Sequence, residues 1–301
     1  MRNVILTSLC IVAMLSAVSC GNKTKPATAG SSDTTVIDFV PALADDYDLD
    51  QSPDFSIRNI ELKEKFGTWD YSLSVDYPTS GSESLLQGVR QWIAKQLAPD
   101  AVSESAKHFV DNADASLNDG EEVLEFYSRQ FKALAEGELD MSGELPEDIQ
   151  MEYTTEIKQT CGYGPFVTFC SMTYFYGGGA HGSTLFEGAS FDANTGERIG
   201  WNMIADKKAL HKEVVEGLKR NFETESDEQL MSYLLLADEN ATTADIPLPT
   251  SEPFLTEQGL ELVYQQYEVA CYAAGMPTVI IPWATAVKLL HRDYQLMAPG
   301  M

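Results

Sequence analysis

The chain has 301 residues, of which 44% are hydrophobic and 22% are charged, a composition typical of a soluble globular protein. Its 46 acidic and 20 basic residues give a net charge of −26, which repels nucleic acid and anionic lipid headgroups. The charge therefore excludes nucleic acid as a partner and favours cationic ones, although a negative surface that only keeps the protein in solution is the commoner explanation.

The first 19 residues have the pattern of a bacterial lipoprotein signal peptide. Arg2 provides a positive start, residues 4–18 are mostly apolar, and small side chains precede Cys20. The apolar run is shorter than the about 20 residues that a transmembrane helix needs. We therefore expect cleavage before Cys20 and lipidation of that cysteine. The protein would then be lipid-anchored in the bacterial cell envelope, facing the periplasm unless it is exported to the surface, with the anchor as its membrane contact.

Three cysteines remain after the signal peptide and Cys20 are set aside, namely Cys161, Cys170 and Cys271. An odd number of cysteines cannot all form pairs. Cys161 and Cys170 flank a turn at residues 162–165 but stand at unequal distances from it, which places them out of register for a disulfide. We expect free thiols that pack as small hydrophobic side chains.

Residues 20–52 are predicted to be a flexible tether, because they lack apolar periodicity and include an acidic run at residues 45–50. The acidic run could also bind a ligand, but a solvated linker is the commoner meaning. The folded sequence after the tether is predicted to consist of an N-terminal α+β subdomain at residues 53–149 and a C-terminal α+β domain at residues 150–298.

The N-terminal subdomain is predicted to open with two strands joined around residues 67–68, since apolar and polar residues alternate on both sides of that turn. Ser80 and Glu83 have the spacing of a capping box, and apolar residues then recur at helical spacing until Pro99. Two further helical segments are predicted, a less regular one at residues 102–110 and a clear one that opens at Asp119 and ends at Gly137.

The C-terminal domain is predicted to be richer in strands. Helices begin at the capping residues Asp206 and Ser226, and a last helix begins at Pro282 and runs through Leu290. The predicted fold class is α+β, with the N-terminal strand-and-helix subdomain packed on a C-terminal antiparallel sheet with helices. The predicted strands of this domain are residues 151–161, 166–176, 185–191, 197–201, 259–264, 267–272 and 278–281.

Four glycines and a histidine follow the second of these strands, at residues 177–182. Gly177, Gly179 and Gly182 satisfy the G-x-G-x-x-G pattern of dinucleotide-binding proteins. That chemistry needs a helix to begin at the glycines, so that its N-terminal amides face a pyrophosphate. Here another strand and a hairpin turn follow, so we interpret the match as accidental. We predict a strand-to-strand turn, which we call the glycine corner.

No catalytic arrangement accompanies His181 in the sequence. The histidines at positions 108, 211 and 291 form no HExxH pair, and no G-x-S-x-G motif is present. We therefore predict no catalytic residue, metal or cofactor. Half of the tyrosines on the nearby strands must point away from the core if the strands alternate, although core packing is the simpler role for each of them. The candidate binding residues are Tyr174, Tyr176, Gly178, Gly179, His181 and Tyr272.

Several motifs resemble the RsiV/PdaC-like family of extracytoplasmic domains. They are YGGGAHG at residues 176–182, FDANTGE at 191–197, YEVACYAAG at 267–275 and VIIP at 279–282, with Cys271 at a position where that family usually has proline. The resemblance implies an α+β fold built around the glycine corner. Its members include the lysozyme-binding exterior of an anti-sigma factor and the accessory domain of a peptidoglycan deacetylase. The sequence shows neither an anti-sigma segment nor a deacetylase domain, so we expect the extracytoplasmic domain alone, on a lipid anchor.

Three hypotheses about function follow. The first is a non-enzymatic envelope lipoprotein that binds a cell-wall-related protein or glycan, with cationic lysozyme as one such ligand, because the negative charge would steer the encounter. The second is an envelope enzyme acting on peptidoglycan or polysaccharide, with His181 and an acidic partner such as Asp192 in its site. The third is a structural or assembly lipoprotein without a soluble ligand.

Overall fold

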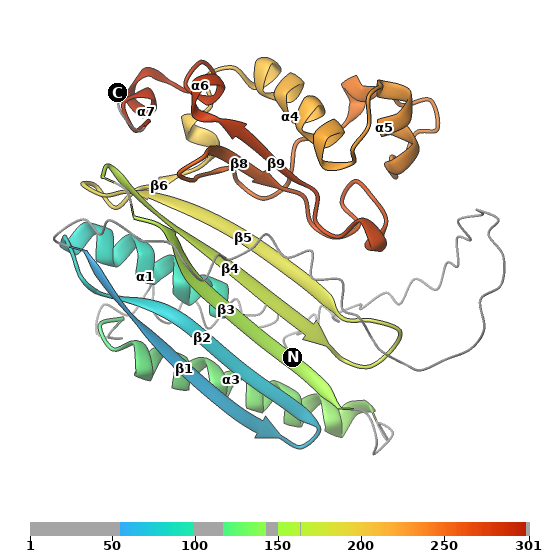
Figure 1. Cartoon of the computed structure of the whole chain (residues 1–301). Coiled ribbons are helices and arrows are strands. Elements are labelled where there is room, and N and C mark those ends of the chain that lie inside the picture. Colours follow the sequence, from blue (N-terminus) through green and yellow to red (C-terminus); the bar gives the residue numbers. More distant parts are fainter. Residues whose placement is uncertain (1–54, 99–116, 143–149, 163, 299–301) are drawn as a thin grey trace, which may run out of the picture. The chain divides into compact units, whose positions relative to one another are not determined.

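The computed structural model describes residues 55–98, 117–142, 150–162 and 164–298, all of which belong to one structural unit. They form a six-stranded sheet, a three-stranded sheet and helices that pack on both, so the predicted α+β class is confirmed (Figure 1). The predicted signal peptide, Cys20, the tether and the helical piece at residues 102–110 lie outside the described residues. The elements in chain order are β1 (Ser56–Phe66), β2 (Trp69–Ser80), α1 (Glu83–Leu97), α3 (Gly120–Ser142), β3 (Met151–Cys161), β4 (Phe166–Tyr176), β5 (Ser183–Asp192), β6 (Arg198–Ile199), α4 (Lys207–Asn221), α5 (Asp227–Tyr233), β7 (Phe254–Leu255), β8 (Gly259–Val263), β9 (Thr278–Pro282), α6 (Trp283–Ala286) and α7 (Arg292–Gln295).

The larger sheet has the strand order β1-β2-β3-β4-β5-β6. Neighbouring strands are antiparallel except β2 and β3, which are parallel. A parallel pair needs a long crossover connection, and α1 and α3 lie in the crossover from β2 to β3. Strands from both sides of residue 150, where the sequence suggests a division, therefore share one sheet.

Helix α1 begins at a capped residue, two positions later than the sequence predicts. The hydroxyl of Ser82 accepts a hydrogen bond from the Leu85 N–H at 3.4 Å, which satisfies one of the free amides of the first turn. The cap predicted at Ser80 is wrong because that residue is the last of β2. The predicted end of the helix ahead of Pro99 is confirmed, since α1 ends at Leu97.

Helix α3 begins after Asp119, as predicted. The Asp119 carboxylate accepts a hydrogen bond from the Glu121 N–H at 2.9 Å, and the helix then continues through Gly137, where its end was predicted. The two helices cover one face of the larger sheet (Figure 1). An aromatic core fills the space between the helices and the sheet, with buried side chains from both layers: Trp69, Tyr71, Trp92, Tyr127, Phe131, Tyr153 and Phe169.

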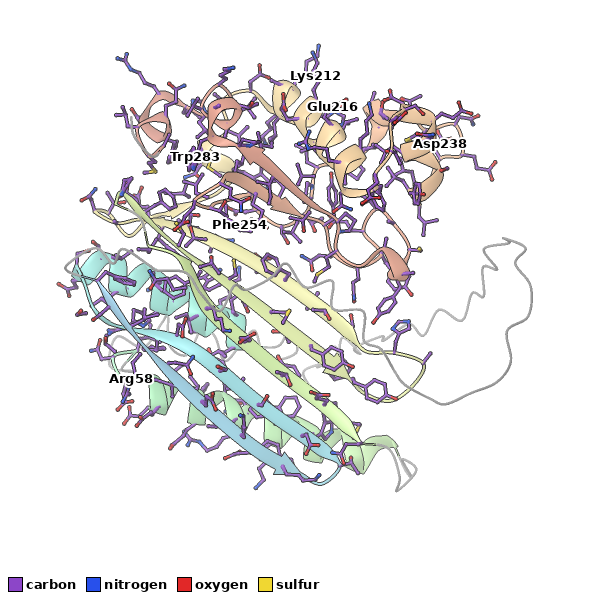
Figure 2. The ribbon with its side chains drawn as sticks, in the orientation of Figure 1. Arg58, Lys212, Glu216, Asp238, Phe254 and Trp283 are labelled. Carbon is purple, nitrogen blue, oxygen red and sulfur yellow. The ribbon has the colours of Figure 1, made fainter. Side chains whose placement is uncertain are left out.

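The smaller sheet, with the order β7-β8-β9, covers the opposite face of β4 and β5. Buried hydrogen bonds join the two sheets: the Thr168 hydroxyl donates to the Leu255 carbonyl at 2.7 Å, and the Leu255 N–H donates to the Ser190 hydroxyl at 2.7 Å. Phe254, labelled in Figure 2, packs its ring so tightly on Gly188 that a Cβ on this glycine would overlap the ring. The contact between the sheets is therefore dry and close.

Helix α4 covers the other face of the smaller sheet. It begins after its predicted cap, Asp206, whose carboxylate accepts a hydrogen bond from the Ala209 N–H at 2.9 Å. Its apolar residues Leu210, Val214 and Leu218 are fully buried, and the helix packs against β9. Helix α5 likewise begins after its predicted cap, Ser226. None of the described helices is long and apolar enough to cross a membrane.

Two C-terminal predictions are wrong. Residues 267–272 do not form a strand, because the chain turns at Tyr267, which has φ +66°. The helix predicted from Pro282 through Leu290 forms only the short α6, after which the chain makes an isolated bridge between Leu290 and Ile204.

The three cysteines of the folded region are thiols, as predicted. In the hairpin of β3 and β4, Cys161 lies opposite Thr168 and Cys170 lies opposite Lys158, so the two thiols do not face each other. Burial raises the pKa of the Cys170 thiol to about 12, which keeps the thiol protonated and unreactive.

Candidate ligand-binding site

The glycine corner connects β4 to β5 as an antiparallel hairpin, which confirms the predicted strand-to-strand turn (Figure 1). Gly178 and Gly179 have φ values of +93° and +113°, which favour glycine over residues with a Cβ. Gly182 lies directly against the ring of Tyr174, and a Cβ there would overlap it. The Tyr176 hydroxyl donates a hydrogen bond to the Gly179 carbonyl at 3.0 Å. Tyr174 and Tyr176 of β4 therefore both contact the glycine corner.

His181 packs against an aromatic ring from a segment far along the chain. Its ring stacks on Tyr272 with centroids 3.9 Å apart and an interplanar angle of 22°. Its Nδ1 lies 2.9 Å from the Gly182 carbonyl. A carbonyl oxygen only accepts, so in the neutral ring Nδ1 carries the proton and Nε2 is an acceptor. The Tyr267 hydroxyl lies 3.5 Å from Nε2, in position to donate to it.

The turn at residues 265–268 is attached to β5 through two glutamine side chains. The Gln265 side chain accepts from the Phe186 N–H at 3.0 Å and donates to the Phe186 carbonyl at 2.7 Å. The Gln266 side chain accepts from the Thr184 N–H at 3.0 Å. The two amides thus occupy the backbone groups along an edge of β5 that a neighbouring strand would otherwise use.

Glu268, the last residue of this turn, holds the turn through hydrogen bonds that do not involve β5. The Glu268 carboxylate accepts hydrogen bonds from the Gln265 N–H at 2.7 Å and the Thr250 N–H at 2.6 Å. The Glu268 N–H closes the turn on the Gln265 carbonyl at 3.1 Å. Three of the four side chains in the turn therefore hold the backbone in place.

Tyr267 is the remaining residue, and its side chain points outward. It is 58% exposed, and its positive φ is an outlier for a bulky side chain, with a cost of about 1–3 kcal/mol. Its ring lies 5.7 Å from Tyr272 and 6.5 Å from His181. The turn thus holds a strained, exposed tyrosine against two other rings, an arrangement that suits contact with a ligand better than core packing.

We call Tyr174, Tyr176, His181, Tyr267 and Tyr272 the aromatic cluster. Burial first, and then the nearby groups Glu152, Tyr272 and Tyr176, raise the pKa of the Tyr174 phenol. Tyr174 therefore lies close both to the other strand tyrosine and to Tyr272 from the distant segment. The structure thus brings together all six candidate residues from the sequence, together with Tyr267, which was not among them. Another tyrosine of the second half, Tyr264, is buried, and its hydroxyl donates to the Pro247 carbonyl.

The pair considered for catalysis is not brought together. His181 precedes the first residue of β5 and Asp192 is its last, so about 30 Å of strand separates them. The Asp192 carboxylate accepts from the N–H groups of Asn194 and Thr195, at 2.8 and 2.9 Å, within the next turn. Among the residues that the structure describes, no group of three or more His, Cys, Asp or Glu side chains is arranged to hold a metal ion.

Comparisons with known proteins point to one family. The model of DUF3298, a family described as proteins of unknown function, matches residues 202–284. This stretch includes the turn with Tyr267 and excludes the glycine corner. No curated protein matches the chain.

Two solved structures are similar to the chain. A DUF3298 family member from Bacteroides fragilis has a TM-score of 0.58 and 14% sequence identity, covering 80% of this chain and 94% of that chain. A DUF3298 family protein from Pseudomonas aeruginosa has a TM-score of 0.48 and 16% identity, covering 82% of this chain and 97% of that chain. The likeness to the Bacteroides fragilis protein shows a shared fold.

Proposed function

We propose that the protein is a non-enzymatic lipoprotein of the bacterial cell envelope, which binds a cell-wall-related protein or glycan through the aromatic cluster. The observation that carries the proposal is Tyr267, an exposed ring held at a strained backbone position by a turn whose other side chains are all used to fix it. Strain of this kind is typical of functional positions. Tyrosine is also enriched among the residues that dominate binding energy.

The sequence supports the setting of this function. The lipoprotein signal pattern ahead of Cys20 supports a lipid anchor, and the resemblance to the RsiV/PdaC-like family supports a role at the cell wall. Lysozyme is a ligand worth testing because a net charge of −26 attracts a cationic protein at long range. Such attraction weakens as salt shortens the range of electrostatic forces.

The test is a binding measurement with the purified chain that begins at residue 21. Lysozyme and peptidoglycan fragments serve as separate probes, each at low and at physiological salt. We expect at least one probe to bind, and Tyr267→Ala to weaken that binding by about tenfold or more. Tyr233→Ala is the matched control, because Tyr233 is 54% exposed and stacks on Phe222, outside the aromatic cluster.

Thermal unfolding of each variant separates lost binding from lost folding. A folded Tyr267→Ala protein that binds as tightly as the unaltered chain would contradict the site. If neither probe binds even at low salt, the proposed function itself is wrong.

A further inference from the structure

The aromatic cluster adjoins the face of the larger sheet that α1 and α3 leave uncovered among the described elements. In the register of the strands, Tyr176 on β4 lies opposite Glu152 on β3, which pairs with Asp70 on β2, which pairs with Lys65 on β1. Residues paired in this way project their side chains from the same face. One row of side chains therefore leads from the aromatic cluster across four strands.

A second row runs beside the first. Tyr174 lies opposite Thr154, which pairs with Ser72, which pairs with Lys63. The Ser72 and Thr154 hydroxyls lie 3.3 Å apart. Beyond the tyrosines, the first row thus has two carboxylates and an ammonium group, and the second row has two hydroxyls and an ammonium group.

This face is open to solvent over β1, β2 and β3. Its side chains are half-buried or exposed, whereas the intervening residues of β2 and β3 are buried under α1 and α3. A shallow cleft of about 250 Å³ lies on it, lined by Lys63, Asp70, Ser72, Glu152 and Thr154, among others. Both rows therefore cross a hollow that begins at β3 and has room for a ligand.

Three ion pairs account for most of the charges on the open face, and Asp76 and Glu152 are the others. Lys65 forms an ion pair with Asp70 at 3.1 Å and Lys63 with Glu61 at 3.2 Å. Lys158 likewise pairs with Glu156 at 2.9 Å. The face therefore has much less net charge than the chain as a whole, and a strongly cationic protein is not the partner that it complements best.

We propose that the ligand of this site is an uncharged saccharide chain, which stacks on the aromatic cluster and runs across the open face toward the cleft. The proposal rests on the proposed function and names its ligand class. Sugar rings present apolar C–H faces that pack on tyrosine rings, while their hydroxyls both donate and accept hydrogen bonds. Carboxylate, hydroxyl and ammonium groups side by side satisfy both roles without requiring charge on the ligand.

The geometry also predicts a dependence on chain length. The spacing between neighbouring strands is about 4.8 Å, so β5, whose edge holds the turn with Tyr267, and β2, which carries Ser72, lie about 14 Å apart. A short saccharide that stacks on Tyr267 does not reach Ser72 in the cleft, whereas a chain of several sugars contacts both.

The experiment compares chitin disaccharide with chitin hexasaccharide by calorimetry, and includes lysozyme as a third, separate probe. We expect the hexasaccharide to bind more tightly than the disaccharide. Tyr267→Ala weakens both interactions, while Ser72→Ala weakens hexasaccharide binding by about three- to tenfold and leaves disaccharide binding unchanged. Ser232→Ala, the same change at an exposed serine of α5, is the control and leaves both unchanged.

The outcomes separate this inference from the proposed function. Lysozyme binding without any saccharide binding overturns the saccharide proposal and leaves the proposed function standing. Equal affinity for the two saccharides, or no effect of Ser72→Ala in a folded protein, would show that the open face is not part of the binding site. Absence of binding to all three probes counts against both proposals.

Discussion

The two faces of the larger sheet are built from alternate residues of the same strands, and they differ in almost every property. One face is sealed by α1 and α3 over a core of stacked aromatic rings, such as Tyr71 and Phe131 with centroids 4.5 Å apart. The other face is dry where the smaller sheet covers β4 and β5, and polar where β1, β2 and β3 are uncovered. The contrast indicates that one face supplies stability, which leaves the side chains of the other available for binding.

Neighbouring residues of β2 test this division with the largest expected effect. Leu73 is 1% exposed on the helix-covered face, so Leu73→Ala should lower the free energy of unfolding by about 2–5 kcal/mol. Ser74 projects from the open face, and Ser74→Ala should change it by less than about 0.5 kcal/mol. Urea unfolding measures both. Similar losses in the two variants would show that the open face is also structural.

A half-buried carboxyl tests the part of that face which the smaller sheet covers. Glu261 of β8 lies between the sheets, and burial raises the pKa of its carboxyl to about 7, so the folded protein favours its neutral form. Its contribution to stability is therefore complete below the ordinary glutamate pKa and is lost as the pH rises through about 7. The upward shift corresponds to a loss of at most about 3 kcal/mol.

Glu261→Gln keeps the neutral shape at every pH. We expect this variant to match the unaltered protein near pH 4 and to exceed its unfolding free energy near pH 8 by up to about 3 kcal/mol. Urea unfolding at the two pH values provides the comparison. An unaltered protein that is the more stable of the two at pH 8 would mean that the junction is not dry.

A substitution of Tyr267 tests whether the strained backbone of the turn at residues 265–268 serves ligand binding. Asparagine tolerates a positive φ far better than tyrosine, so Tyr267→Asn should raise the free energy of unfolding by about 1 kcal/mol while it removes ligand binding. Chemical denaturation and the binding assay measure the two effects. A less stable variant would show that Tyr267 is held in place for packing.

The smallest effect is expected from the ion pairs of the open face. Lys65 and Asp70 form an exposed pair, so a double-mutant cycle with Lys65→Ala and Asp70→Ala should give a coupling energy of about 0.2–1 kcal/mol. Stronger coupling would indicate that these charges hold the sheet together and are not available to a ligand.

The sequence predicts most elements of this fold because their signals are local. Residues 151–161 and 166–176 form strands with the predicted bounds, and Asp119, Asp206 and Ser226 begin helices as predicted. The parallel pairing of β2 with β3 was not predicted, because pairing between strands so far apart in the chain leaves no mark on either one. The rows on the open face depend on that pairing.

The site was predicted only in part, because some of its residues have local signals and others depend on contacts between distant segments. His181 and the glycines stand out in the sequence, and the tyrosines of β4 follow from alternation. Tyr267 could not be assigned, because its role depends on the bonds that Gln265, Gln266 and Glu268 make to residues many positions earlier. One local sign was available. Tyr267 is flanked by Gln265, Gln266 and Glu268, and such a polar run does not favour the strand that was predicted to begin at Tyr267.

The hydrogen bonds from Gln265 and Gln266 to the edge of β5 also bear on how the protein avoids self-association. An unpaired strand edge is a template for other chains, and it leads to aggregation or exchange of segments between copies. Gln265 and Gln266 occupy the backbone groups of Phe186 and Thr184, so no foreign strand can pair there. The segment that presents Tyr267 to a ligand therefore also protects this edge from other copies of the same chain.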